Sequence, residues 1–169
     1  MPVGREGGGM ATRGKIKIGG ILRFRDLCLV GVMSAPDRPG LAAAIFGALG
    51  EAGLNCQFIV QSIDLNNDSH VQFCIDIGDR ERVLEILEPI RLRLGAQKVI
   101  ARWPVAMLGV FGPDFRERPG IAGMAFGALA AAGVNILAVS TSISTISCLV
   151  EESDFEAALE GLQQVFLLP

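Results

Sequence analysis

The chain has 169 residues, half of them hydrophobic, and a formal net charge of −3. This composition excludes a largely disordered chain, and it gives no basic surface of the kind that binds nucleic acid or an anionic membrane. Residues 119–150 contain no charged side chain. Because a membrane span needs only about 20 apolar residues, this segment must be explained before any other.

The first half of the chain predicts the element order βαββαβ. The expected elements are strands at 27–33, 56–63, 69–77 and 97–102, and helices at 41–52 and from Asp79 onward. Strand 69–77 alternates, which places His70 and Cys74 together on a solvent-facing side. Gly53 is expected to end the first helix. Asp79 is expected to cap the second helix, which Pro89 would bend.

The second half predicts the same order without its last strand. The expected elements are strands at 105–111, 135–142 and 145–150, and helices at 120–132 and from Ser153 onward. Ser153 and Glu156 predict a capping box. A strand-like segment at 15–21 is expected to complete the second sheet, so that the first domain is inserted into the second. The expected domains are 22–97 and 15–21 plus 98–169, after a disordered leader at 1–14.

An internal repeat accounts for the uncharged segment. RPGLAAAIFGALGEAGLNCQFIVQSI at 38–63 aligns with RPGIAGMAFGALAAAGVNILAVSTSI at 118–143, and half of the positions are identical. Ordinary residue usage would give about two identities by chance. The first copy carries Glu51, and a glutamate in a bilayer core costs several kcal/mol. Since similar copies should share an environment, we expect two similar domains and no membrane span.

The cysteines and the single histidine support neither a metal site nor catalysis. The four cysteines are Cys28, Cys56, Cys74 and Cys148. They form no Cys-x-x-Cys pair, and with the single His70 they give no set of ligands with metal-site spacing, so no metal or cofactor is expected. With no recognisable signal peptide, reduced and buried cysteines in a cytoplasmic protein are the favoured interpretation. His70 is expected to be solvated, Trp103 to pack between the domains, and no nucleophile–base set emerges.

One constellation recurs between a strand and a helix in both copies. Its residues are Asp37, Arg38, Pro39 and Gly40 in the first copy, and Asp114, Arg118, Pro119 and Gly120 in the second. The free N–H groups of a helix N-terminus suit a carboxylate, glycine lets a ligand approach the backbone, and a nearby aspartate could accept from an ammonium group. These features suit a free α-amino acid. The same residues would equally serve as the turn that the fold needs.

At this point the sequence resembles a known family. VGVMSAPDRPGLAAAIFGALGEAGLN resembles an ACT domain, a small βαββαβ module that binds amino acids. VAMLGVFGPDFRERPGIAGMAFGALAAAGVNILAVSTS is similar to the second ACT domain of aspartate kinase, and FIVQSI resembles the first-domain strand that carries a ligand-contacting glutamine, here Gln61. The resemblance covers about residues 15–168. It implies an α+β fold of two ferredoxin-like ACT domains, the first inserted into the second.

The resemblance also implies a function. Such regions, often also made as a separate β subunit, form homodimers and bind Lys or Thr as feedback inhibitors at ACT–ACT interfaces, acting on a kinase catalytic subunit. By position, the implied ligand-binding residues are Asp37, Arg38, Pro39, Gly40, Leu41, Ala42 and Gln61 in the first domain and Asn135, Ile136, Ser140 and Thr141 in the second. A chain of this length cannot hold the kinase catalytic domain, so no enzymatic activity is expected.

Two departures from the family pattern leave a second interpretation open. The family usually has a glutamate and then a basic residue after Ser-Thr-Ser, where this chain has Ile143 and Thr145. The loop at 112–118 also differs from the family's usual loop before Pro-Gly. The alternative is a free-standing tandem ACT protein that senses an amino acid for another enzyme or a regulator. In either case, so apolar a pair of small domains is expected to form a dimer.

Overall fold

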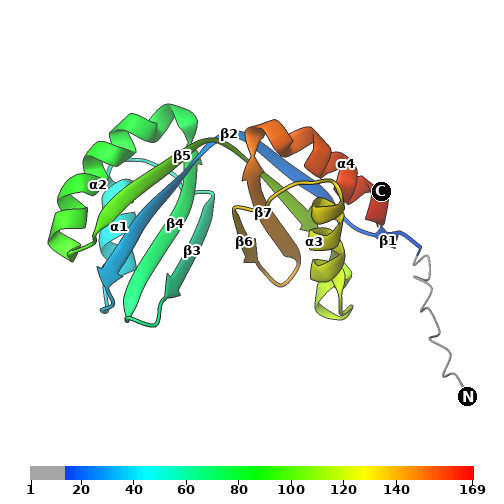
Figure 1. The fold of residues 1–169 in the computed structure, drawn as a ribbon, viewed down its shortest axis with the longest axis horizontal. Helices are drawn as coiled ribbons and strands as arrows, with labels where there is room; N and C mark the ends of the chain where they lie inside the picture. The colour runs from blue at the N-terminus through cyan, green and yellow to red at the C-terminus, as the bar shows by residue number, and fades with distance from the viewer. Residues whose placement is uncertain (1–13) are drawn as a thin grey trace, which may run out of the picture.

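The structure, a computed structural model, describes residues 14–169 and consists of two halves joined by two long strands (Figure 1). The strands are β1 (Ile16–Lys17), β2 (Gly20–Pro36), β3 (Phe58–Ile63), β4 (Asp68–Asp76), β5 (Lys98–Phe111), β6 (Ala138–Thr141), β7 (Thr145–Glu151) and β8 (Phe166–Leu167). The helices are α1 (Leu41–Glu51), α2 (Arg80–Leu94), α3 (Ile121–Ala131) and α4 (Phe155–Val165), with 3-10 turns η1 (Ile77–Asp79), η2 (Pro113–Arg116) and η3 (Glu152–Asp154). The expected leader lies, apart from Gly14, outside the described residues.

Six strands form one antiparallel sheet in the order β3-β4-β2-β5-β7-β6. The central strands β2 and β5 pass from one half to the other (Figure 1). In the first half, the end of β2 pairs with β4 and with the beginning of β5; in the second, the beginning of β2 pairs with the end of β5, which also pairs with β7. Helices α1 and α2 cover one half-sheet, and α3 and α4 the other. This arrangement confirms the predicted α+β fold of two ferredoxin-like units.

The structure corrects the details of how the second sheet is completed. The strand that completes it is residues 20–24, which pair with residues 107–111. The earlier part of the expected segment, Ile16–Lys17, pairs in parallel with Phe166–Leu167 instead. The expected domain boundary after residue 97 is also wrong, because residues 98–102 pair with residues 29–33 as the fourth strand predicted for the first half. The Arg-Trp-Pro sequence at 102–104 looks like a break, whereas β5 continues through it.

Each half has its own hydrophobic core, and a third cluster joins them. The third cluster consists of Leu27, Leu29, Phe58, Cys74, Val105, Met107 and Leu149. It lies where the sheet faces that carry no helix approach each other, next to the contact between β3 and β6. Cys74, expected on a wet face, is fully buried there. The alternation of β4 was read correctly, but the second half covers the face that would otherwise meet water.

Several local predictions are also wrong. Both α2 and α4 follow a 3-10 turn, and neither Asp79 nor Ser153 makes the expected capping hydrogen bond. Instead, the Asp76 carboxylate accepts from the Gly78 N–H at 2.9 Å. Trp103, which was expected to pack between the domains, is 46% exposed, and the Arg80 guanidinium carbon lies 4.3 Å from its ring centroid.

The uncharged segment at 119–150 folds as α3, β6 and most of β7. In residues 14–169, no helix is both long and apolar enough to cross a membrane. The segment is apolar because α3 contacts α4 on one side and the second half-sheet on another, so that much of it faces a protein interior.

Candidate functional site

The two Pro-Gly turns have the same backbone conformation. Gly40 has φ +91° immediately before α1, and Gly120 has φ +93° immediately before α3. Side chains with a Cβ rarely adopt this left-handed region, and an added Cβ would meet no atom within 4 Å at either position. Backbone conformation therefore accounts for both glycines. The first N–H to bond back within α1 is that of Ala44, to the Gly40 carbonyl, so the earlier amides at this helix end have no partner within the helix.

A short hydrogen-bond chain brings Asp37 and Gln61 together beside α1. The Ser69 hydroxyl donates to Oδ1 of Asp37 at 2.6 Å, and Nε2 of Gln61 donates to the Ser69 Oγ at 3.4 Å. The main-chain N–H of Asp37 also donates to the Asn67 carbonyl at 3.1 Å. These bonds place the β3–β4 hairpin against the loop that precedes α1. Ser69 was not among the predicted site residues; the structure shows it buried on the core-facing side of β4.

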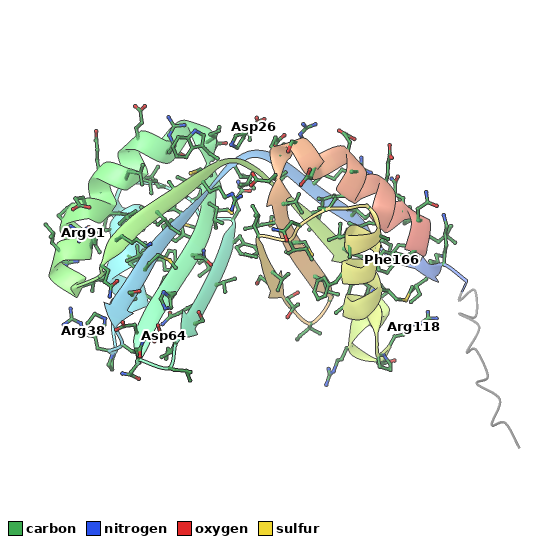
Figure 2. All side chains as sticks on the ribbon, viewed as in Figure 1. Asp26, Arg38, Asp64, Arg91, Arg118 and Phe166 are labelled. Atoms are coloured by element: carbon green, nitrogen blue, oxygen red, sulfur yellow. The ribbon has the colours of Figure 1, made fainter. Side chains whose placement is uncertain are left out.

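Arg38 and His70 have structural partners. Nη2 of Arg38 donates to the Arg93 carbonyl at 3.0 Å, which ties the Pro-Gly turn to the end of α2. His70, expected to be solvated, accepts from the Ser34 N–H through Nδ1 at 3.2 Å and lies 3.0 Å from Oδ2 of Asp64 through Nε2. Figure 2 shows Arg38 and Asp64 at the same end of the first half, with Arg118 at the corresponding end of the second.

The environment of Asp64 is electrostatically favourable for its carboxylate. The hydrogen bond from His70 is the main cause that lowers the pKa of Asp64 below its ordinary value of 3.8, and backbone amides of Asp68 and Asn66 add to it. The Asp64–His70 pair therefore stabilises the β3–β4 hairpin, which carries Gln61 and Ser69. The pair lies beside the candidate site and is not part of it.

In the second half, a cavity of about 240 Å³ lies at the N-terminus of α3. Its lining consists of Phe115, Arg118, Pro119, Gly120, Ile121, Ala122, Ser142, Ile143 and Ile146. Apolar side chains from η2 and from the β6–β7 hairpin face the helix end here. The register puts Thr141, opposite Ile146, where the first half has Gln61 opposite Val71. Asp114 lies in η2, and its side chain is not described.

Within one chain, the predicted second-domain residues do not converge. Asn135 and Ile136 follow the far end of α3, and eleven helical residues at 1.5 Å each separate that end from Gly120 by about 16 Å. Ser140 and Thr141 are neighbours on β6, so their side chains point to opposite faces of the sheet. By contrast, the first-domain residues do gather at one helix end.

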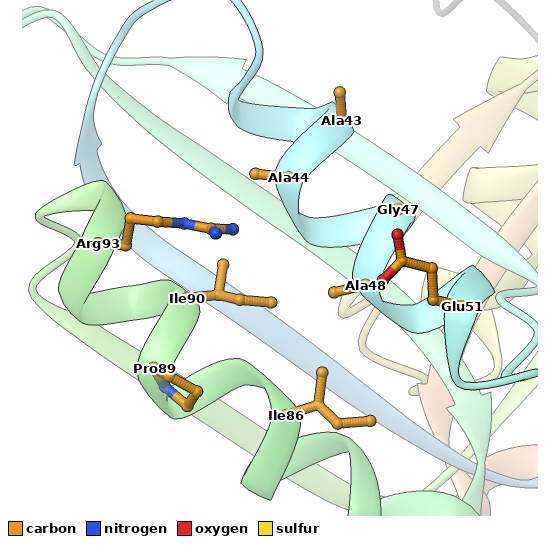
Figure 3. Close-up of a pocket in the computed structure, with 9 residues that line it drawn as sticks. All are labelled: Ala43, Ala44, Gly47, Ala48, Glu51, Ile86, Pro89, Ile90 and Arg93. Carbon is orange, nitrogen blue, oxygen red and sulfur yellow. The ribbon is translucent and has the colours of Figure 1, made fainter.

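A larger hollow than the cavity at α3 lies between the helices of the first half. A groove of about 650 Å³ separates α1 from α2 (Figure 3), where Ala44 and Ala48 of α1 point toward the helix that carries Ile86 and Ile90. None of the predicted ligand-binding residues lines it. Small side chains on α1 leave this groove open, and its lining is mainly apolar, with Glu51 and Arg93 as its two charged residues.

Two sequence matches decide the family. Residues 30–91 and residues 108–166 each match an ACT domain, and the two matches fall on the two halves of the fold. The chain belongs to the ACT domain family. From here on, the half with α1 and α2 is the first ACT domain, and the half with α3 and α4 is the second.

This pair of ACT domains is of the kind that forms the regulatory region of aspartate kinases. It is 31% identical to aspartate kinase from Stutzerimonas stutzeri and 32% identical to aspartokinase from Pseudomonas aeruginosa, each over 151 residues. These alignments cover 89% of this chain and 37% of the relatives, so the chain spans little more than a third of their length.

Solved structures of aspartate kinase regulatory subunits have the same fold as this chain over nearly their whole length. The regulatory subunit of aspartate kinase from Thermus flavus superposes with a TM-score of 0.82 at 29% identity, covering 89% of this chain and 99% of that one. The ligand-free regulatory subunit from Thermus thermophilus gives 0.81 at 29% identity, with the same coverage. The tandem ACT arrangement, with strands shared between the domains, is therefore a known architecture.

Proposed function

We propose that this chain senses a free amino acid, lysine or threonine, and thereby regulates an aspartate kinase. The observation that carries the proposal is the pairing of Asp37 and Gln61 through Ser69 beside the free amides of α1. A free amino acid carries a carboxylate and an ammonium group on one carbon. The amides at Leu41 and Ala42 suit the carboxylate, and the oxygens of Asp37 and Gln61 suit the ammonium group.

A second copy of the chain would complete the site. β3 exposes Ile59 and Ile63, β6 exposes Val139, and α1 carries only one charged residue, Glu51. Such exposed apolar surface is typical of an interface. In a homodimer formed through ACT–ACT contacts, Asn135, Ile136, Ser140 and Thr141 of one protomer would approach the Pro-Gly turn of the other. This arrangement would explain why these residues do not converge within one chain.

The regulated partner in this proposal is a kinase catalytic part, in the same polypeptide or in a separate subunit. The support is the similarity to aspartokinases and to a solved structure of aspartokinase α and β subunits. The alignment with that structure covers 97% of its matched chain at 29% identity. Regulation requires that the effector bind two arrangements of the dimer with different affinities, because a ligand with equal affinity for both shifts nothing.

The proposal is tested by ligand-induced stabilisation. Lysine or threonine at about a hundred times its dissociation constant should stabilise the fold by about 2.7 kcal/mol and raise Tm. Asp37→Ala and Gln61→Ala should lose this shift, while Gln57→Ala, an exposed glutamine just before the same strand, should keep it. If neither L-amino acid raises Tm above the shift given by its D-enantiomer, the proposal is wrong.

The cavity at α3 favours the alternative of a free-standing sensor for another enzyme or regulator. Phe115, Ile143 and Ile146 give that cavity an apolar part, and Arg118 gives it a positive charge. An apolar side chain fits beside the first three, whereas the lysine ammonium group would be repelled by Arg118. A thermal-shift panel of all twenty amino acids separates the two functions. Shifts with leucine, isoleucine, valine or phenylalanine alone would favour the alternative, and shifts with lysine or threonine favour the kinase effector.

A further inference from the structure

We propose that Ser69 is the positioning residue of the first-domain site: its hydroxyl holds Gln61 and Asp37 so that hydrogen-bond acceptors face the ligand, which selects the ligand's ammonium group. This inference rests on the proposed function, because it assigns the ammonium recognition of that same site. Ser69 itself would not touch the ligand. It acts through two neighbours from different elements, one on β3 and one in the loop before α1.

The burial of Ser69 is the first observation. Ser69 is 0% exposed and is the only polar or charged residue that is fully buried among residues 14–169 with a described side chain. On β4 it shares a face with Val71, Phe73 and Ile75, which are all buried. The strand pattern would accept an apolar residue at this position. A buried hydroxyl costs free energy unless it is paired, so its presence here points to the two polar side chains that it contacts.

The chemistry of the three groups fixes the direction of both hydrogen bonds. A carboxylate only accepts, and a hydroxyl has a single proton, so the Ser69 proton goes to Oδ1 of Asp37 at 2.6 Å. The Ser69 oxygen can then only accept, and its donor is Nε2 of Gln61 at 3.4 Å. If the Gln61 amide were turned over, its Oε1 and the Asp37 carboxylate would both need the single Ser69 hydroxyl proton. The orientation of the Gln61 amide therefore follows from Ser69.

This orientation decides what the site offers to a ligand. With Nε2 engaged by Ser69, Oε1 of Gln61 points to the other side of the amide group, on an exposed side chain. Asp37 keeps its second carboxylate oxygen. Both remaining atoms are acceptors, and the nearby α1 amides are donors. The site is thus polarised, with acceptors for an ammonium group on one side and donors for a carboxylate on the other.

The second ACT domain lacks this device. The serines of its corresponding hairpin, Ser142 and Ser144, are exposed rather than buried, and Thr141 occupies the register position of Gln61. The two domains therefore differ in the chemistry beside their Pro-Gly turns, although the backbone conformation at Gly40 and Gly120 is the same. Ammonium selection is expected from the first domain alone.

The test measures how three Ser69 variants bind two pairs of matched ligands. Ser69→Ala replaces the hydroxyl with hydrogen in an apolar setting, Ser69→Thr restores it, and Ser69→Cys is a near-isosteric second variant that hydrogen-bonds weakly, should alanine disturb the fold. Calorimetry compares L-lysine with 6-aminohexanoate, and L-threonine with 3-hydroxybutyrate; each second ligand lacks the α-amino group. We expect Ser69→Ala to weaken amino-acid binding about tenfold and to leave the affinity for the analogues unchanged. Ser69→Thr should restore the wild-type affinity for the amino acids.

A ligand-free measurement separates this inference from the proposed function. The side-chain NH₂ resonance of Gln61 should show slow exchange in the wild type and in Ser69→Thr, and fast exchange in Ser69→Ala. Equal losses for an amino acid and its analogue would indicate a merely structural role and overturn the inference, as would an unchanged Gln61 resonance in Ser69→Ala. If the wild type binds neither amino acid, the proposed function fails and ammonium selection fails with it, while the Gln61 resonance still decides whether Ser69 orients the amide.

Discussion

Arg25 and Glu152 join the crossover of the shared strands to the second ACT domain. Nε of Arg25 lies 2.5 Å from Oε1 of Glu152, and the Asp26 N–H donates to the other carboxylate oxygen at 3.2 Å. The guanidinium carbon also lies 4.6 Å from the Phe155 ring centroid. The β2–β5 register shifts on both sides of Leu27, so backbone pairing is irregular at this point. The contacts of Arg25 and Asp26 with the second domain thus support β2 where its backbone pairing with β5 is irregular.

The first prediction concerns this ion pair. Glu152→Gln should lower Tm by a few degrees, because the Glu152 side chain is only 15% exposed and its loss leaves the arginine without its main partner. The deficit should shrink in high salt, which screens the wild-type pair. Glu88→Gln is the control, since Glu88 pairs with Arg91 one helical turn away on the surface of α2. Thermal melts at two salt concentrations check this; equal melts for Glu152→Gln and the wild type would contradict it.

The second prediction concerns the backbone at the Pro-Gly turn. Gly40→Ala should lower the free energy of unfolding by about 1–2 kcal/mol, because alanine is strained at φ +91°. Gly47→Ala is the matched control. Gly47 lies inside the same helix and a Cβ there meets no atom within 4 Å, so the change should stabilise by about 0.5–1 kcal/mol. Chemical denaturation measures both, and effects of the same sign would refute the assignment.

The third prediction concerns acid stability. His70 lowers the pKa of Asp64 in the folded state, so this carboxylate contributes stability above its unfolded pKa and loses it as pH falls through the lower folded value. Asp64→Asn should therefore be less stable than the wild type at neutral pH, and the gap should close from about pH 4 downward. Denaturation curves between neutral and acid pH test this. A gap that is independent of pH would exclude the carboxylate as its cause.

The fourth prediction concerns thiol reactivity. Burial raises the pKa of Cys74 to about 12 and that of Cys148 to about 11, and Cys28 is also buried. Only Cys56 is partly exposed. In the native state at pH 8, one thiol should react with a disulfide reagent, more slowly than a free cysteine because burial also raises the pKa of Cys56. Cys56→Ser should abolish that phase, and a persisting fast phase would contradict the burial of the other three.

The sequence predicted those parts of the fold that depend on neighbouring residues. The helices beginning near Leu41 and Ile121, and the glycines before them, follow from local periodicity and turn chemistry, and the structure confirms them. The caps at Asp79 and Ser153 were also local predictions, but they were wrong because a 3-10 turn precedes each helix. Asp37 and Gln61 could be named in advance, whereas Ser69, which connects them, could not.

By itself, the sequence determined that the protein is a duplicated unit of strands and helices, because the repeat preserves the order of apolar strands, Pro-Gly turns and small-residue helices; its resemblance to ACT domains then named the unit. Only the tertiary structure decided which residues meet across the two copies. The continuity of β2 and β5, the burial of Cys74 and the ion pair of Arg25 with Glu152 all depend on partners far away in the chain. Such pairings are set by the register of the shared strands and by how the two half-sheets face each other, and no local pattern of hydrophobicity or charge encodes that geometry.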